Sequence, residues 1–240
     1  THNKLLTQTE YRAVNAKSRH TVDLSILNEK DYSTKNHFFL NSSGELDYNN
    51  FDDTQLSVQL QHVSKNTYLK KYKLNSPLIK SNSTLTSLIN FNTTREDLSI
   101  DVDFIAYENL GEVRNSDKYE FVYPSYSLQK ELGTDLKMPG AFNLSSNGYI
   151  KNYNTNIFEK VVINDFLYSS FPSFTSNGFK NNFNILIKNI NTDSTNSTKY
   201  KESLDTKIAT LVEYNSSYPL EKRTDNYKNV LKPIMSIRYS

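Results

Sequence analysis

Residues 56–61 constrain the fold of this chain most strongly, because hydrophobic and polar side chains alternate there without a break. Leu56, Val58 and Leu60 would point to one side of an extended strand, and the polar residues between them to the other. One face of such a strand avoids water. A soluble sandwich buries that face in a core, and a membrane barrel turns it toward lipid. The alternation alone is compatible with both folds.

Similar strand patterns recur about every 20 residues, separated by clusters of Asn, Asp, Ser and Gly. We therefore predict an all-β chain of about twelve consecutive antiparallel strands. Each has the length of about 9–11 residues, or slightly more, that a tilted membrane-spanning strand requires. The predicted strands centre on residues 5–14, 21–27, 37–47, 54–63, 84–94, 98–107, 118–128, 141–151, 158–168, 180–190, 206–217 and 230–239.

Composition narrows the class of protein further. Hydrophobic residues make up 36% of the chain, which is a low fraction for a globular protein of 240 residues but is typical of strands that face water on one side. No apolar run approaches the roughly 18 residues of a spanning helix, which excludes a helical membrane protein. The net charge of +2 is scattered, so it indicates no nucleic-acid partner. Without any Cys, disulfides, thiolate metal sites and a Cys nucleophile are excluded.

Chemistry-bearing residues form no recognisable active site. Asp101 and Asp103 could share a proton, but a wet barrel wall displays such carboxylates without catalysis. The sequence holds no nucleophile elbow, phosphate-binding glycine loop or metalloprotease motif. We predict no enzyme, no catalytic residue, no cofactor and no metal. The four histidines occur singly, without partners at metal-ligand spacing: His2, His20, His37 and His62.

Three local features carry further expectations. The Lys- and Tyr-rich stretch at residues 68–73 is interpreted as a solvated loop with anchoring tyrosines. Pro124 interrupts a strand pattern, which places it at a bulge or an unpaired position. The predicted strand at 158–168 is apolar on both faces. It therefore either packs against something inside a barrel or has a different register.

Several landmarks resemble the barrel domain of one known family. Residues 61–72 read Gln-His-Val-Ser-Lys-Asn-Thr-Tyr-Leu-Lys-Lys-Tyr, after a strand that ends Thr-Glu-Tyr-Arg at 9–12. Further landmarks follow in order at 119–126, 141–152, 218–220 and 231–239. Their order and spacing resemble the LptD, or organic solvent tolerance, family of outer-membrane proteins that assemble lipopolysaccharide, in its alphaproteobacterial form. The resemblance implies a closed antiparallel barrel of about 26 strands.

The resemblance also implies function, location and partners. Residues 1–240 would be a partial barrel domain in the outer membrane of a Gram-negative bacterium, which inserts lipopolysaccharide into the outer leaflet. A lipoprotein plug similar to LptE, a periplasmic bridge similar to LptA and outer-membrane lipid would be its partners. The family's periplasmic N-terminal domain, first and last barrel strands and disulfide cysteines have no counterpart here. No lateral-gate residue can therefore be transferred, and we expect the chain to be a fragment.

Strand alternation and the resemblance together assign the side chains of two predicted strands, 54–63 and 98–107, either to the barrel lumen or to lipid. Seven side chains would line the lumen: Gln55, Ser57, Gln59, Gln61, Ser99, Asp101 and Asp103. Seven would face lipid: Leu56, Val58, Leu60, Leu98, Ile100, Val102 and Phe104. Two alternatives stay open, a complete smaller pore of about twelve strands and a soluble secreted β-sandwich or adhesin. An active site built from scattered residues is a third, weaker one.

Overall fold

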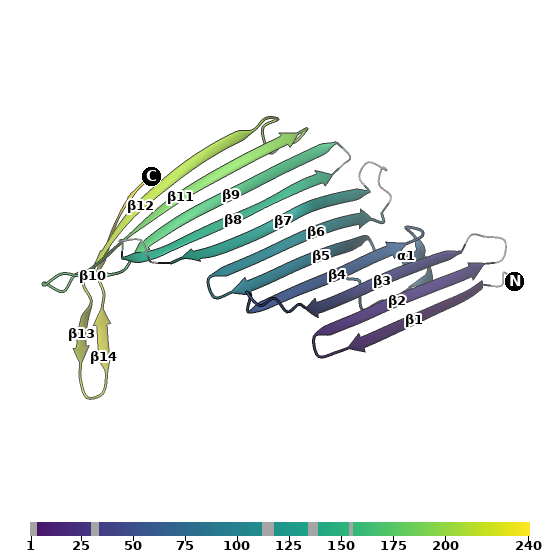
Figure 1. Ribbon diagram of the computed structural model, residues 1–240, viewed down its shortest axis with the longest axis horizontal. Coiled ribbons are helices and arrows are strands. Elements are labelled where there is room, and N and C mark those ends of the chain that lie inside the picture. Colours follow the sequence, from purple (N-terminus) through teal and green to yellow (C-terminus); the bar gives the residue numbers. More distant parts are fainter. Residues whose placement is uncertain (1–3, 30–33, 112–117, 134–138, 154–155) are drawn as a thin grey trace.

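A computed structural model describes residues 4–29, 34–111, 118–133, 139–153 and 156–240 (Figure 1). Within these residues, twelve strands follow one another in a single antiparallel sheet, and each pairs with the next. They are β1 (Lys4–Val14), β2 (Ser18–Glu29), β3 (Lys35–Glu45), β4 (Asp53–Val63), β5 (Thr84–Arg95), β6 (Leu98–Asn109), β7 (Tyr119–Leu132), β8 (Gly140–Tyr153), β9 (Ile157–Ser170), β11 (Lys180–Thr195), β12 (Asp205–Ser217) and β15 (Ile234–Tyr239).

The sheet is a single curved layer (Figure 1). The solvent-accessible area of the chain is 16264 Å², against the roughly 11,000 Å² that a compact monomer of this mass would expose. No second sheet packs face to face against it within the described residues, so the sandwich alternative does not hold. The sheet is also open, because β1 and β15 each pair on one side only in this part of the chain.

The strand predictions are confirmed except at the last strand. Residues 230–239 do not form one strand, because the chain breaks at Pro233, which has no N–H to donate to a sheet. Before the break, β14 (Lys228–Leu231) pairs with β13 (Leu220–Arg223) in a hairpin. After it, β15 returns to β12. The hairpin projects beyond the lower end of the sheet (Figure 1), and a two-residue strand, β10 (Ser173–Phe174), pairs with β11.

Pro124 lies at a bulge, as predicted. The register of β7 shifts against β8 between Val122 and Ser125, and against β6 between Asp103 and Ile105. The missing N–H of a proline is tolerated at such a position because the ladder is already interrupted.

The prediction of a solvated loop at residues 68–73 is wrong, because this segment is folded against the sheet. It contains a short helix, α1 (Tyr68–Tyr72), whose Tyr68 and Leu69 are 0% and 1% exposed. They pack in the hydrophobic cluster that contains Leu27 and Phe39. We call residues 64–83, which connect β4 to β5, the cap. Among the described residues, no helix is long and apolar enough to cross a membrane.

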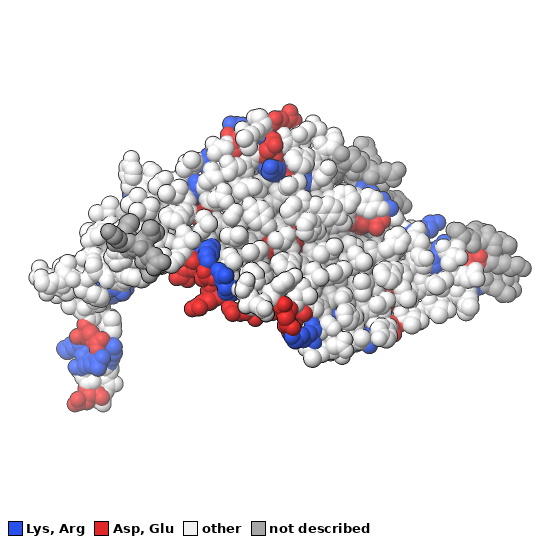
Figure 2. Space-filling view, in the orientation of Figure 1, with Lys and Arg blue, Asp and Glu red and all other residues white. Residues whose placement is uncertain are grey.

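The two ends of the sheet differ. The cap and the connection at residues 196–204 lie at the upper end (Figure 1). The lower end carries short turns at residues 15–17 and 96–97, but also the longer connections at 171–179 and 218–233. Figure 2 shows one face of the sheet, on which charged side chains gather along the rims and on the β13–β14 hairpin and are sparse over the middle.

Candidate functional site

The strand register brings the seven residues predicted for the lumen onto one face, which we call the polar face. Cross-strand pairs form continuous rows on it. Gln55 pairs with Asn92, which pairs with Asp101. In the next row, Ser57 pairs with Asn90 and then with Asp103. Gln59, Gln61 and Ser99 lie on the same face by strand alternation.

Amides satisfy the carboxylates of the polar face. The Asn90 Nδ2 donates to Asp103 Oδ1 at 2.8 Å and to Asp101 Oδ2 at 3.1 Å. The Asn92 Nδ2 donates to Asp101 Oδ2 at 3.0 Å. Asp101 and Asp103 are therefore held by neutral donors on β5, and their cross-strand partners on β7 are Ser127 and Ser125. This wall can accept and donate hydrogen bonds to a polar ligand.

The seven residues predicted to face lipid all lie on the opposite face, which we call the apolar face. Leu56, Phe91 and Val102 form one cross-strand row, and Val58, Ile89 and Phe104 form the next. Ile89 is 44% and Phe104 43% exposed, so nothing in the described chain covers them. Leu60, Leu98 and Ile100 share this face. His62 ends β4 on it, beside Phe38, and is exposed as expected of a strand end.

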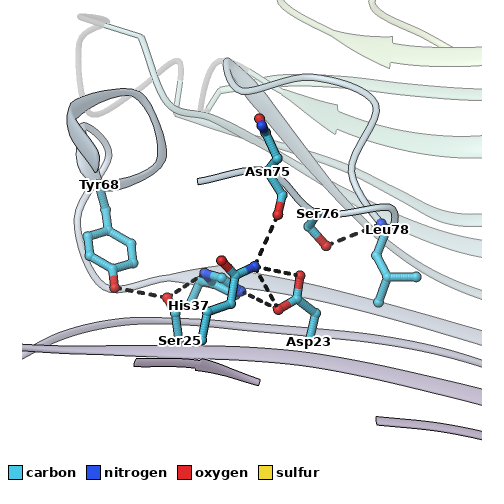
Figure 3. Close-up of polar contacts among 8 residues, drawn as sticks. Asp23, Ser25, His37, Tyr68, Asn75, Ser76 and Leu78 are labelled. Carbon is cyan, nitrogen blue, oxygen red and sulfur yellow. Dashed lines mark hydrogen bonds and ion pairs between the residues drawn. The ribbon is translucent and has the colours of Figure 1, made fainter. Parts of the chain in front are cut away.

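The cap is joined to the polar face of β2 and β3 by a chain of buried polar side chains (Figure 3). Asp23 Oδ1 lies 3.2 Å from His37 Nε2, and His37 Nδ1 lies 2.7 Å from the Oγ of Ser25. That Oγ is also hydrogen-bonded to the hydroxyl of Tyr68, in α1, at 2.9 Å. All four residues are at most 2% exposed, so each of their polar groups needs a hydrogen-bond partner within the protein. We call these four residues the latch.

Side chains of two more strands bind the backbone of the cap directly. The Gln8 Nε2 donates to the carbonyl of Asn75 at 3.0 Å and also to the Asp23 carboxylate (Figure 3). The Gln61 Nε2 donates to the carbonyl of Leu78 at 2.8 Å. The cap is thus fixed to β1, β2 and β4 by hydrogen bonds, in addition to its hydrophobic contacts.

The latch arranges an acid, an imidazole and a hydroxyl in the order used by serine hydrolases. Its serine is nevertheless enclosed, because Ser25 is 1% exposed and its Oγ is already bonded to Tyr68. His37 also stacks on Phe39, with ring centroids 4.4 Å apart. A substrate could not reach the hydroxyl while α1 is in place, so in this structure the latch holds the cap.

A second upper connection also folds over the polar face. In the connection at residues 196–204, the hydroxyl of Tyr200 is hydrogen-bonded to the hydroxyl of Tyr149 at 3.2 Å. In the same connection, Ser197 Oγ donates to Glu159 Oε1 at 2.7 Å. Val161, the cross-strand neighbour of Tyr149, is only 5% exposed. This cover accounts for an apolar residue, Val161, on the polar face of β9.

Polar side chains also cross part of the apolar face, which the sequence analysis missed. They form a hydrogen-bonded ladder over β7 to β12, in which the Asn164 Nδ2 donates to Asn189 Oδ1 at 3.1 Å. Because the members bond to one another, each amide or hydroxyl is at least partly satisfied without water. The ladder consists of Tyr126, Ser146, Asn164, Asn189, Asn191 and Thr206.

Sequence reasoning did not identify the latch, although a signal for it existed. Asp23 and Ser25 lie two residues apart on the polar face of β2, and His37 lies on the next predicted strand. Only the register of β2 against β3, which pairs Ser25 with His37, brings them together. No family model and no curated protein matches this chain, so the case for its function starts from the two faces of the sheet and the cap.

Proposed function

We propose that this chain forms part of the wall of an outer-membrane β-barrel that carries lipopolysaccharide to the outer leaflet. One observation carries the proposal: the connections that fold over the sheet cover parts of its polar face, while the apolar rows stay exposed. A soluble protein gains about 25 cal/mol for each Å² of apolar surface that it removes from water. A sheet that leaves its apolar rows exposed and folds its connections over parts of its polar face is therefore suited to hydrocarbon on the outside.

The two faces also match the two halves of the proposed cargo. Lipopolysaccharide joins a polar sugar to several acyl chains, so its route must offer hydrogen bonds and hydrocarbon together. The amide and carboxylate rows at Asn90 and Asn92 supply the first. The bilayer beside the apolar face supplies the second. The ordered landmarks that resemble those of the LptD family support this cargo over others.

Further strands and partners belong to the proposal. An unpaired strand edge carries a row of free N–H and C=O groups that lipid cannot satisfy. Additional strands on β1 and β15 would close the barrel. A lipoprotein plug inside it and a periplasmic bridge that delivers the cargo complete the machine. The chain itself performs no catalytic step and needs no cofactor.

Photo-crosslinking from two adjacent positions tests the proposal. Benzophenone-bearing residues replace Asn90 on the polar face and, as the matched control, Ile89 on the apolar face, in the full-length protein in the outer membrane of a Gram-negative host. We expect ultraviolet light to attach lipopolysaccharide to position 90 and bilayer lipid to position 89. Absence of captured lipopolysaccharide at position 90 in correctly inserted protein would contradict the proposal. Steady single-channel conductance from the 240-residue chain alone would favour the smaller pore instead.

A further inference from the structure

The cap concentrates positive charge. Its twenty residues contain five lysines and no Asp or Glu, in a chain that as a whole has 28 basic and 26 acidic side chains. All five lysines are exposed. They are Lys65, Lys70, Lys71, Lys73 and Lys80.

None of these five lysines forms an ion pair with another residue that the structure describes. Lysines elsewhere on the sheet commonly do: Lys151 bonds Glu120 at 2.8 Å, and Lys188 bonds Asp165 at 2.7 Å. Two acidic residues of β2 are already engaged: Glu29 is shared by Lys4 and Lys35, and Asp23 is bonded to His37 and Gln8. The charge of the cap is therefore not neutralised by the described chain.

The backbone that carries three of these lysines is folded against the sheet and is not a free loop. Lys70 and Lys71 belong to the last turn of α1, and Lys73 ends the helix in a left-handed conformation with φ 52°. Beneath them, Tyr68, Leu69 and Leu74 are at most 4% exposed and packed against the sheet. Because like charges fixed close together repel one another, an anion bound among them relieves that repulsion.

Below the cap, the polar face has the opposite character. Its rows carry neutral amides and the two carboxylates of Asp101 and Asp103, which disfavour an anion. An anionic ligand that moves along this wall would bind best at the cap. Lysine ammonium groups bind phosphate as point charges and do not require a fixed planar geometry.

We propose that Lys70, Lys71 and Lys73 bind the phosphate groups of a phosphorylated glycolipid head group at the upper end of the polar face. This inference rests on the transport function proposed above, which supplies the identity of the ligand as a glycolipid. The lysines themselves specify only the phosphate. A free phosphate or pyrophosphate ion shares that chemistry, so the experiment must separate the two sources.

Binding of labelled lipopolysaccharide to the full chain in detergent micelles tests the inference. The triple variant Lys70→Gln, Lys71→Gln, Lys73→Gln should weaken binding roughly 10-fold, since each exposed ion pair contributes modestly. A matched triple variant at the exposed Lys207, Lys222 and Lys232 loses the same charge and should change binding less than about 2-fold. Arginine at the three cap positions should retain binding. Lipopolysaccharide stripped of its phosphates should bind wild type and variants alike.

Three outcomes would overturn the inference. The cap variant could bind phosphorylated lipopolysaccharide as tightly as wild type, or both triple variants could lose binding equally. Pyrophosphate alone could bind the cap as tightly as the glycolipid does, which would make it a free-anion site. Failure of the transport function is a separate observation, because it appears as missing capture at position 90 while lysine-dependent binding persists. Circular dichroism confirms that the variants keep the sheet.

Discussion

The hydroxyl of Tyr68 is hydrogen-bonded to the Oγ of Ser25 at 2.9 Å, across 43 residues of sequence. This contact joins α1 to the second strand of the sheet and places the cap on the polar face. Because both groups are buried, the bond is shielded from competition by water. The position of the cap therefore depends on a small number of specific contacts, which single substitutions can test.

Tyr68→Phe should loosen the cap without unfolding the sheet. Loss of one buried hydrogen bond costs about 0.5–1.5 kcal/mol, which raises the open population of the cap several-fold. Limited trypsin digestion measures this opening, since Lys70 and Lys71 are cleavage sites within α1. Tyr72→Phe is the matched control, because the Tyr72 hydroxyl is buried without a hydrogen-bond partner among the described residues. Its removal should leave the digestion rate unchanged. Equal acceleration in both variants would contradict the role of the latch.

The Asp23–His37 pair should show strong coupling in a double-mutant cycle. His37→Leu leaves the Asp23 carboxylate buried with Gln8 as its remaining side-chain partner, and the expected loss is about 3–5 kcal/mol. The double variant Asp23→Leu, His37→Leu removes both polar groups together. Its loss should be well below the sum of the two single losses. Denaturant unfolding in micelles measures all four proteins, and additive losses would mean that the two side chains do not interact.

The alternating strands could be predicted from sequence because their signal is local. Each face of a strand meets one environment along its whole length, so Leu56, Val58 and Leu60 are enough to define both faces of β4. Neighbouring strands then follow from the same period of two and from Asn- and Asp-rich turns. The exact register could not be predicted, and the structure aligns apolar rows such as Val58 with Ile89.

The cap and the latch could not be predicted in the same way. A five-residue helix is too short to show a period of 3.6, and its core partners Leu27 and Phe39 lie in distant strands. The latch requires the relative register of β2 and β3 and the return of Tyr68 over them. The β13–β14 hairpin was missed because Val230 and Leu231 extend the apolar pattern toward β15, and only Pro233 marks the break.

Gly148→Ala should destabilise the sheet, because the glycine makes room for a neighbouring ring. A Cβ at this position would lie 2.6 Å from Cε1 of Tyr126 and 2.7 Å from the carbonyl oxygen of Val161. Overpacking of this kind costs about 1–3 kcal/mol. Gly44→Ala is the control, since its nearest neighbours would be 3.8 Å away. Thermal unfolding of both variants measures the difference, and similar melting temperatures would contradict the prediction.

The turn between β5 and β6 should weaken only in strong acid. Hydrogen bonds from Arg95, whose Nε lies 2.6 Å from Oδ1, and from Lys130 lower the pKa of Asp97 to about 2. The unfolded pKa is about 3.9. A lowered pKa means that the stabilisation is complete above about pH 4 and is lost as the pH falls through about 2. An NMR titration of the Asp97 carboxyl carbon gives the midpoint. Asp97→Asn should abolish this acid-dependent loss of stability, and a midpoint near 4 would contradict the prediction.

Two adjacent arginine substitutions in β6 test which face meets lipid. Val102 lies on the apolar face between Phe91 and Tyr126, and Asp103 lies on the polar face between Asn90 and Ser125. If hydrocarbon covers the apolar face, Val102→Arg should cost about 2–4 kcal/mol near the bilayer midplane. Asp103→Arg stays in a polar environment and should cost less than about 1 kcal/mol. Guanidinium unfolding in lipid vesicles measures both. Because both substitutions introduce arginine into the same strand, the strand propensity of arginine cannot explain a selective loss of stability at Val102. Equal losses at the two positions would contradict the prediction that the apolar face meets lipid.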